Sequence, residues 1–509
     1  MGQRFRLGPR KRVLIVNAFL DEYRRTRGSP NRVPRAMGPV YLAGAFDPAL
    51  WQVELWNEQY SGLLADLGRL RDLDMLVLTG VTAALDRMRQ LTAYARTLSP
   101  EVVVAAGGPA VRALPKLTAG IFDYACRGDI EELQAAVADA FGYRYASAEM
   151  FPRYDLPYGG GMIGYVESSR NCNFRCSFCA LTGEKGRYRT YDLDFVRRQI
   201  EAVGKRQICF IDNNFYGNDR DFFRAKVELC GGLWREGRID GWSCLVTGDF
   251  FAEPENLRRV AAAGCQGIFS GVESFDAATL AAYRKRQNTI VPQVRMIRDC
   301  LEAGVLFTYG IMLDPSSRPV AQLRDEIEFI LAQPEITLPA FFTLAIPLLG
   351  TPYFRQCVEG GLFLPNTLLR NLDGVTLTMR PLDDIETALD FVSGLTSLRG
   401  YRRKVLDHNR RFLWRYRRTL TPLQLCASSV MSALIATEAF ASSPTRRQGR
   451  RVRPSYYGPS QQLDDCYRPA IRVPSRYEPL FRPIRITDAD GGPHPDIALD
   501  SLDHPERST

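Results

Sequence analysis

Residues 167–183 read ESSRNCNFRCSFCALTG and place Cys172, Cys176 and Cys179 within eight positions of one another. The other nine of the 12 cysteines are scattered singly along the chain. Three thiolates on one loop can converge on a metal centre, and three rather than four leave one iron of a cubane cluster open for a non-protein ligand. Structural zinc usually needs four ligands, and no further cysteine or histidine lies nearby. The tight spacing therefore favours a cluster over zinc or over three unrelated buried cysteines.

Outward from this motif, strand-like and helix-like stretches alternate over residues 163–385. Short continuous apolar runs are typical of buried parallel strands. Six such runs lie at 163–168, 207–215, 241–246, 267–274, 306–313 and 341–347. Six strand–helix units are too few for a closed eightfold barrel, so we expect a partial (β/α)6 barrel with the cysteines after its first strand.

Residues 1–145 show the same alternation and predict a doubly wound α/β domain. Apolar runs at 11–19, 74–79 and 102–106 read as strands, and residues 84–98 carry apolar side chains at helical spacing. Such sheets bind ligands outside the carboxyl ends of their strands. Residues 146–162 contain two prolines and three consecutive glycines, so we expect a linker there.

Residues 386–509 read as a mainly helical C-terminal domain with a partly disordered tail. Residues 401–453 hold 13 lysines and arginines against two acidic residues, although the whole chain has a net charge of only +9. The stretch YRRKVLDHNRRFLWRYRR, residues 401–418, interleaves arginines with aromatic rings. Such a segment could bind RNA, an anionic membrane surface or an acidic substrate, and the simplest interpretation is a solvated basic helix. No apolar stretch is long enough to span a membrane and no signal peptide is evident, so we expect a cytoplasmic protein.

The CxxxCxxC spacing, with Phe178 before the last cysteine, resembles the radical S-adenosylmethionine (SAM) superfamily. The resemblance implies a partial barrel, a 4Fe-4S cluster on Cys172, Cys176 and Cys179, SAM on the fourth iron, and an external electron donor. FIDNNFYGN (210–218) and GIFSGVES (267–274) resemble two further strands of the family. They imply cofactor contacts from strand ends, by Asp212, Asn213, Glu273 and Ser274, together with Phe178. The structural alternatives are a helix-capping turn for the first pair and a barrel-lining salt bridge for Glu273.

Four segments of the N-terminal domain resemble, in order, the cobalamin-binding domain of class B radical SAM enzymes: MGPVYLAGAF, LTGVTAAL, AAGGPAV and YACRGDIEEL. Glycines in such loops allow close backbone approach to a large flat ligand, although a generic α/β domain also has glycine-rich turns. The resemblance implies that these loops cradle the corrin and its nucleotide tail through Thr79, Thr82, Gly107, Gly108, Pro109, Arg127 and Gly128. The domain has no histidine, so we expect a His-free cobalt with a cation, Arg69 or Arg87, on its lower face.

We interpret the chain as a cobalamin-dependent radical SAM methyltransferase, in which a methyl group passes from SAM through methylcobalamin to a substrate carbon. One branch of the family is similar to the tryptophan C2 methylase of natural-product biosynthesis and transfers the methyl group without a SAM-derived radical. In that branch we expect Glu273 as an iron ligand, Arg69 below cobalt and Tyr309 as the base that takes the ring proton. Simple packing is the alternative role for Tyr309.

The expected partner is a small molecule, such as an aromatic amino acid, with no nucleic acid; peripheral membrane contact through residues 401–453 stays open. Three other functions compete with this interpretation. The first is another cobalamin-binding radical SAM reaction: ring formation, oxidation, or methylation of an aliphatic or lipid carbon. The second is a tRNA methylthiotransferase, which would need a second cysteine triad in the N-terminal domain, where only Cys126 is present. The third is a non-catalytic nucleic-acid- or membrane-binding protein.

Overall fold

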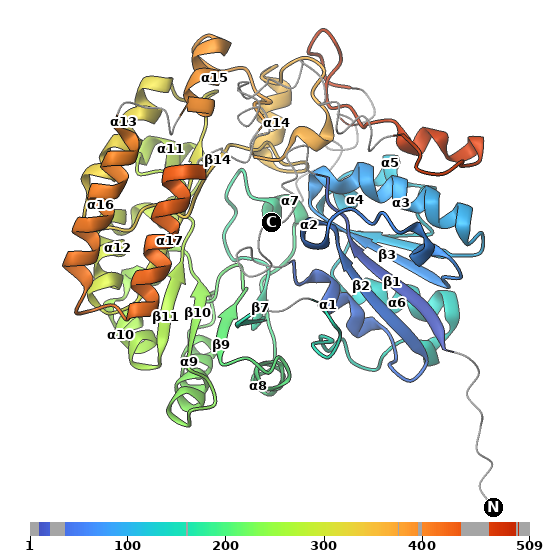
Figure 1. Ribbon diagram of the computed structural model, residues 1–509, viewed down its shortest axis with the longest axis horizontal. Helices are drawn as coiled ribbons and strands as arrows, with labels where there is room; N and C mark the ends of the chain where they lie inside the picture. Colours follow the sequence, from blue (N-terminus) through green and yellow to red (C-terminus); the bar gives the residue numbers. More distant parts are fainter. Residues whose placement is uncertain are drawn as a thin grey trace, which may run out of the picture.

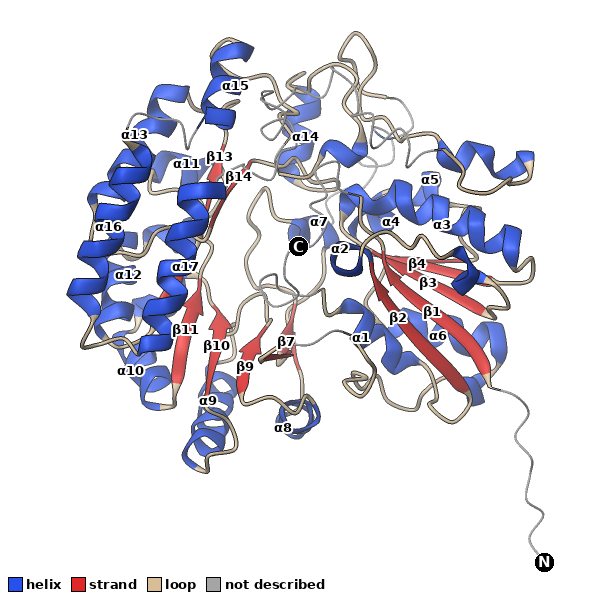
Figure 2. Cartoon of the chain, viewed as in Figure 1, coloured by secondary structure: helices blue, strands red, loops and turns tan. Residues whose placement is uncertain are grey.

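The computed structural model describes residues 10–20, 36–158, 161–374, 376–394, 400–438, 468–494 and 497. Two parallel sheets lie on opposite sides of the middle of the molecule, with helices on both faces of the N-terminal sheet and on the outer side of the barrel sheet (Figures 1 and 2). The predicted α/β fold class is confirmed. One strand of the N-terminal sheet, and the packing of C-terminal segments beside each sheet, were not predicted from the sequence.

The N-terminal sheet has the strand order β2-β1-β3-β4-β5, all parallel. Its strands are β1 (Lys11–Asn17), β2 (Trp51–Asn57), β3 (Met75–Thr79), β4 (Val103–Gly107) and β5 (Tyr124–Cys126). Alternate residues of β1 enter two cores: Leu14 packs on the side of α3 (Leu85–Leu98), and Val13 on the side of α6 (Glu131–Phe141). Both faces are therefore buried, which explains the uninterrupted apolar run. The sequence did not single out β2, because polar residues interrupt its apolar ones.

The second sheet has the order β12-β11-β10-β9-β6, and β13 pairs in parallel with β14 beyond it. The strands are β6 (Ile163–Val166), β9 (Gln207–Phe210), β10 (Gly241–Leu245), β11 (Cys265–Phe269), β12 (Leu306–Thr308), β13 (Gly310–Leu313) and β14 (Phe341–Leu344). The expected strand 306–313 is broken at Tyr309. The helices outside the sheet include α8 (Leu193–Ala202), α9 (Arg220–Arg235), α10 (Pro254–Ala262), α12 (Gln293–Glu302) and α13 (Val320–Ala332). This is the expected partial barrel.

The residues predicted to form a separate C-terminal domain pack partly on the barrel and partly on the N-terminal domain. Helices α15 (Ile385–Gly394), α16 (Tyr401–Tyr416) and α17 (Pro422–Glu438) share the apolar core of the barrel. The Gln424 amide donates to the carbonyl oxygens of Gln266 and Gly304 at 2.7 and 2.8 Å. Residues 468–494 instead pack on the N-terminal domain, where the Phe481 ring lies 5.3 Å from that of Tyr94 on α3.

The C-terminal part of the chain is thus structurally part of the two preceding domains. The expected tail after Ser443 falls mostly outside the described residues. Among the helices that the structure describes, none has both the length and the apolar character needed to cross a membrane.

Candidate functional site

The three clustered cysteines lie on a loop closed by a short antiparallel pair, β7 (Ser169–Arg170) with β8 (Arg189–Thr190). Helix α7 (Ala180–Glu184) begins directly after Cys179. The Cys176 side chain is buried and those of Cys172 and Cys179 are half-buried. The loop follows β6, the first barrel strand, as the sequence predicts.

The cysteine thiols have donors and a cation around them. The Gln287 side-chain amide lies 3.3 Å from Cys176 Sγ, and the backbone N–H of Phe174 donates to Cys172 Sγ at 3.5 Å. The pKa of Cys172 is raised to about 11, chiefly by burial and also by the other two thiols, while the Phe174 N–H and the Lys285 charge oppose the rise. N–H donors and a nearby positive charge stabilise thiolates and sulfur-bound clusters, so the donor set fits a three-thiolate iron site. Within the described residues, no three Cys, His, Asp or Glu side chains already meet metal-binding geometry.

Glu273 lies near this loop but is held by Lys285. The Lys285 Nζ is 2.6 Å from Glu273 Oε1, and the two side chains are only 8% and 18% exposed. The same Nζ lies 5.6 Å from the centre of the Phe178 ring. Glu273 therefore forms the barrel-lining salt bridge that was its structural alternative. The sequence analysis missed Lys285 and Gln287, because no motif marks them and only the fold brings them to the cysteines.

Two other predicted barrel residues, Asp212 and Ser274, lie in buried polar networks. Asp212 is fully buried, and its carboxylate accepts from the backbone N–H of Ser168 at 2.6 Å and lies 3.5 Å from Lys226 Nζ. Ser274 is also fully buried, and its hydroxyl donates to Glu326 at 2.7 Å. Both side chains take part in buried polar networks, and their roles as SAM contacts stay predictions. Asn213, the next residue after Asp212, is exposed.

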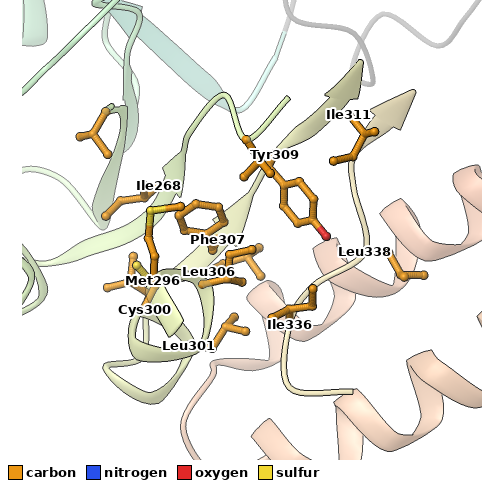
Figure 3. Close-up of a cluster of buried hydrophobic side chains, with 14 of the residues drawn as sticks. Ile268, Met296, Cys300, Leu301, Leu306, Phe307, Tyr309, Ile311, Ile336 and Leu338 are labelled. Atoms are coloured by element: carbon orange, nitrogen blue, oxygen red, sulfur yellow. The ribbon is translucent and has the colours of Figure 1, made fainter. Parts of the chain in front are cut away.

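Tyr309 is a core residue (Figure 3). Its hydroxyl donates to the Thr337 carbonyl at 2.8 Å, and its ring lies 5.9 Å from that of Phe275 and 6.1 Å from that of Phe307. Burial raises its pKa well above the ordinary value for tyrosine. The structure thus shows the simple packing that was its alternative role, and the proton-accepting role stays a prediction.

The N-terminal sheet forms a pocket of about 190 Å³ at the carboxyl ends of β3, β4 and β5. Of the predicted corrin-contacting residues, Thr79, Gly107, Gly108 and Gly128 line it. Gly108 has a φ of 111°, and a Cβ there would lie 2.8 Å from the Gly80 carbonyl oxygen. Close packing of loop backbones thus requires glycine and leaves room for a ligand.

The remaining predicted residues of this domain lie outside that pocket. Thr82 is buried in a short 3-10 helix, Pro109 begins α4 (Pro109–Ala113), and Arg127 donates to the Pro115 carbonyl at 3.2 Å. Arg127 and Asn213 line a second pocket, of about 270 Å³, between the two domains.

Neither predicted lower-face cation is free. Arg69 is ion-paired with Glu54, and its guanidinium lies 4.9 Å from the centre of the Trp56 ring. The buried Arg87 is paired with Glu58 at 2.8 Å. A carboxylate pairs with each arginine, and the role of either one as the cation below cobalt stays a prediction.

The two pockets adjoin each other, because Arg112, Gly128, Asp129 and Glu184 line both. Arg112 of the N-terminal domain pairs with Glu184 of α7 at 3.0 Å. The glycine-lined pocket therefore continues toward the cysteine loop.

A buried charge cluster lies in the second pocket beside the cysteine loop. Arg170 lies 2.7 Å from Glu167 and is also paired with Asp129 of the N-terminal domain. Burial raises the pKa of Glu167 to about 7, against the opposing effect of Arg170. These ion pairs connect the two domains at the candidate site.

Residues 166–318 match the sequence model of the radical SAM superfamily, so this part of the chain is a radical SAM domain. The chain is 27% identical over 206 residues to bacteriochlorophyllide d C-8(2)-methyltransferase of Chlorobaculum tepidum, covering 38% of this chain and 44% of that protein. It is 24% identical over 296 residues to hopanoid C-2 methylase of Rhodopseudomonas palustris, covering 54% and 55%. The chain thus spans about half the length of these curated relatives.

Two solved structures share the fold. The cobalamin-dependent SAM radical enzyme OxsB, with aqua-cobalamin and SAM bound, superposes with a TM-score of 0.56 at 14% identity, over 87% of this chain and 76% of that one. The radical SAM methyltransferase TsrM from Kitasatospora setae, with tryptophan and a SAM analogue bound, superposes with a TM-score of 0.53 at 15% identity, over 86% and 99%. At these identities the likeness concerns the fold, including the N-terminal sheet beside the barrel.

Proposed function

We propose that this protein is a cobalamin-dependent radical SAM methyltransferase that moves a methyl group from SAM to a carbon atom of a small substrate. The main support is that a glycine-lined pocket at the carboxyl edge of the N-terminal sheet adjoins a second pocket beside the three-cysteine loop of the radical SAM domain. The two curated relatives and TsrM are methyltransferases, which supports methyl transfer as the reaction.

The residues present suit these cofactors. When bound, the corrin would carry the methyl group, and the cluster would supply the electron that cleaves SAM. Cys172, Cys176 and Cys179 would hold the cluster, and Gln287 would donate to the Cys176 sulfur. Thr79, Gly107, Gly108 and Gly128 would line the site for part of the corrin.

We propose the radical route rather than the route without a radical. The route without a radical would use Glu273 as an iron ligand, Arg69 as the cation below cobalt and Tyr309 as the base. Glu273 is paired with Lys285, Arg69 with Glu54, and Tyr309 is enclosed in the core. With Glu273 held in a salt bridge, the open iron is left for SAM.

We propose a small molecule as the substrate. The tryptophan-bound TsrM structure supports an aromatic amino acid, whereas the similarity to hopanoid C-2 methylase supports a lipid carbon. A cytoplasmic location and an external electron donor complete the proposed function.

The test uses anaerobically purified, reconstituted protein and SAM carrying a labelled methyl group. We expect a UV–visible spectrum with both cluster and corrin absorption, label in the substrate, and 5′-deoxyadenosine formed together with the methylated product. S-adenosylhomocysteine without 5′-deoxyadenosine would overturn the radical route. Absence of bound corrin would overturn cobalamin dependence, and label in a lipid but not in tryptophan would decide the substrate class.

A further inference from the structure

Helices α16 and α17 pack against each other on the outside of the barrel, on the side remote from the N-terminal sheet (Figure 1). Their inner faces belong to the barrel core, through Val405 and Phe412 of α16 and Ile435 of α17. Their outer faces have no packing partner among the described residues.

The outer face of α17 is apolar. Leu423, Cys426, Ala427 and Val430 follow one another at helical spacing and are all exposed, Leu423 at 58% and Val430 at 48%. A solvated helix normally carries polar residues on its outer face, so this apolar stripe indicates an unpartnered surface.

The outer face of α16 is cationic with two large apolar side chains. Arg403, Arg410 and Arg417 are exposed, and between them lie Leu406, 66% exposed, and Trp414, 69% exposed. The Arg417 guanidinium lies 4.5 Å from the centre of the Trp414 ring. Residues 401–418 contain eight lysines and arginines and a single acidic residue. The exposed apolar groups are thus accompanied by an excess of positive charge.

The cations on the side of α16 are already paired with the barrel. Lys404 bonds to Glu328 of α13 at 2.6 Å, and Arg415 lies 3.5 Å from Glu302 of α12. Arg410 is paired within α16 with Asp407 at 3.0 Å, and in the described part of the chain no acidic residue of another helix contacts Arg403, Arg410 or Arg417. The exposed guanidinium groups of Arg403 and Arg417 therefore remain available to an external anionic group, whereas Arg410 shares its charge with Asp407.

The aromatic residues favour lipid over RNA as the occupant. Tyr401, Phe412 and Tyr416 are buried in the core, so only Trp414 of the four Phe, Tyr and Trp rings of α16 could stack on a base. Recognition of single-stranded RNA uses several exposed rings, and it has no use for the apolar stripe of α17. A bilayer interface takes all three components: apolar side chains, an interfacial tryptophan and cations near lipid phosphates.

We propose that the outer faces of α16 and α17 form a docking surface for an anionic lipid bilayer. The helices lie in the plane of the interface, with Leu406, Trp414, Leu423 and Val430 in the headgroup–acyl boundary. The outward arginines then lie at the level of the lipid phosphates. Docking at this surface is independent of which substrate the enzyme methylates.

The test measures co-sedimentation of the full-length holoprotein with vesicles of phosphatidylcholine alone and with vesicles that also contain phosphatidylglycerol. We expect binding only to the anionic vesicles, weakened by salt. The triple variant Arg403→Glu/Arg410→Glu/Arg417→Glu should bind more weakly by at least on the order of 100-fold, at the usual contribution of a basic residue near an anionic surface. The matched control is Arg224→Glu/Arg235→Glu/Arg258→Glu, on exposed positions of α9 and α10, which should bind like the wild type.

Tryptophan fluorescence gives an independent readout. Trp414 emission should shift to shorter wavelength on anionic vesicles, and Trp414→Phe should remove the shift while leaving the fold intact by circular dichroism. Four results would overturn the proposal. They are no vesicle binding by the wild type, equal loss in the α9–α10 control, tighter binding to single-stranded RNA than to vesicles, and a dimer in solution that Val430→Asp dissociates.

Discussion

The two parallel sheets present their carboxyl ends to the same central region, yet their predicted site residues lie in different surroundings. In the N-terminal sheet, Thr79, Gly107, Gly108 and Gly128 line one pocket. In the barrel, the side chains of Asp212, Ser274 and Tyr309 are buried and hydrogen-bonded to protein groups. Three of the four N-terminal residues are glycines, which reach the pocket through their backbone at or just after a strand end and have no side chain to turn away. The side chains of Asp212, Ser274 and Tyr309 can instead turn either toward a pocket or into the core, and position along the chain does not decide which.

The largest expected effect concerns the cysteine loop. Replacing Cys172, Cys176 and Cys179 together by Ala should abolish bound iron and sulfide, because no thiolate ligands remain. Iron and sulfide analysis after anaerobic reconstitution measures this. Cys209→Ala is the matched control, since this single cysteine lies on β9 away from the loop, and it should keep the cluster. A triple variant that retains the wild-type iron content would place the cluster elsewhere.

Asp212 and Asn213, which are neighbours just after β9, provide the next comparison. Asp212→Asn should lower the free energy of unfolding by about 3–5 kcal/mol, because the buried Lys226 loses its counterion. The exposed Asn213→Ala should change it by less than about 0.5 kcal/mol. Chemical denaturation of both variants measures the difference. Weaker SAM binding by Asp212→Asn at unchanged stability would restore Asp212 as a cofactor contact.

The same substitution at two strand glycines, one in each sheet, tests whether the N-terminal pocket holds cobalamin. A Cβ at Gly107 of β4 would meet Cys126 at 3.5 Å, an ordinary contact, so Gly107→Val should fold but fill the pocket. Overfilling a site typically costs about 1–3 kcal/mol, so cobalamin affinity should fall roughly 10–100-fold. Gly267→Val on β11 is the control, with its nearest neighbour at 3.6 Å. Equilibrium binding of cobalamin should distinguish them, and equal affinities would contradict the assignment of this pocket.

The smallest expected effect is at Tyr309. Tyr309→Phe removes one buried hydrogen bond to Thr337, so the free energy of unfolding should fall by about 1 kcal/mol. The methylation rate and its pH profile should stay unchanged, because the hydroxyl does not reach a pocket. Thermal unfolding and rate measurements across pH check both parts. A large loss of rate at unchanged stability would return Tyr309 to the reaction as a base.

Local pattern explains why much of the fold was predictable. Both faces of β1 are buried, which gives an apolar run that sequence alone reveals, and the cysteine motif needs only its own spacing. The edge strand β2 and the packing of residues 468–494 on α3 were missed. Edge strands mix polar and apolar residues, and docking of a distant segment depends on contacts that no local pattern encodes.

The sequence by itself determined the two parallel sheets, the cysteine loop after the first barrel strand and the glycine-rich turns of the N-terminal domain. These features depend on residues close together in the chain. Only the tertiary structure decided that Lys285 holds Glu273, that Gln287 reaches Cys176, and that Arg69 and Arg87 are neutralised by carboxylates. Those pairings join residues on separate elements, and which charge meets which depends on how strands and helices pack around a shared core.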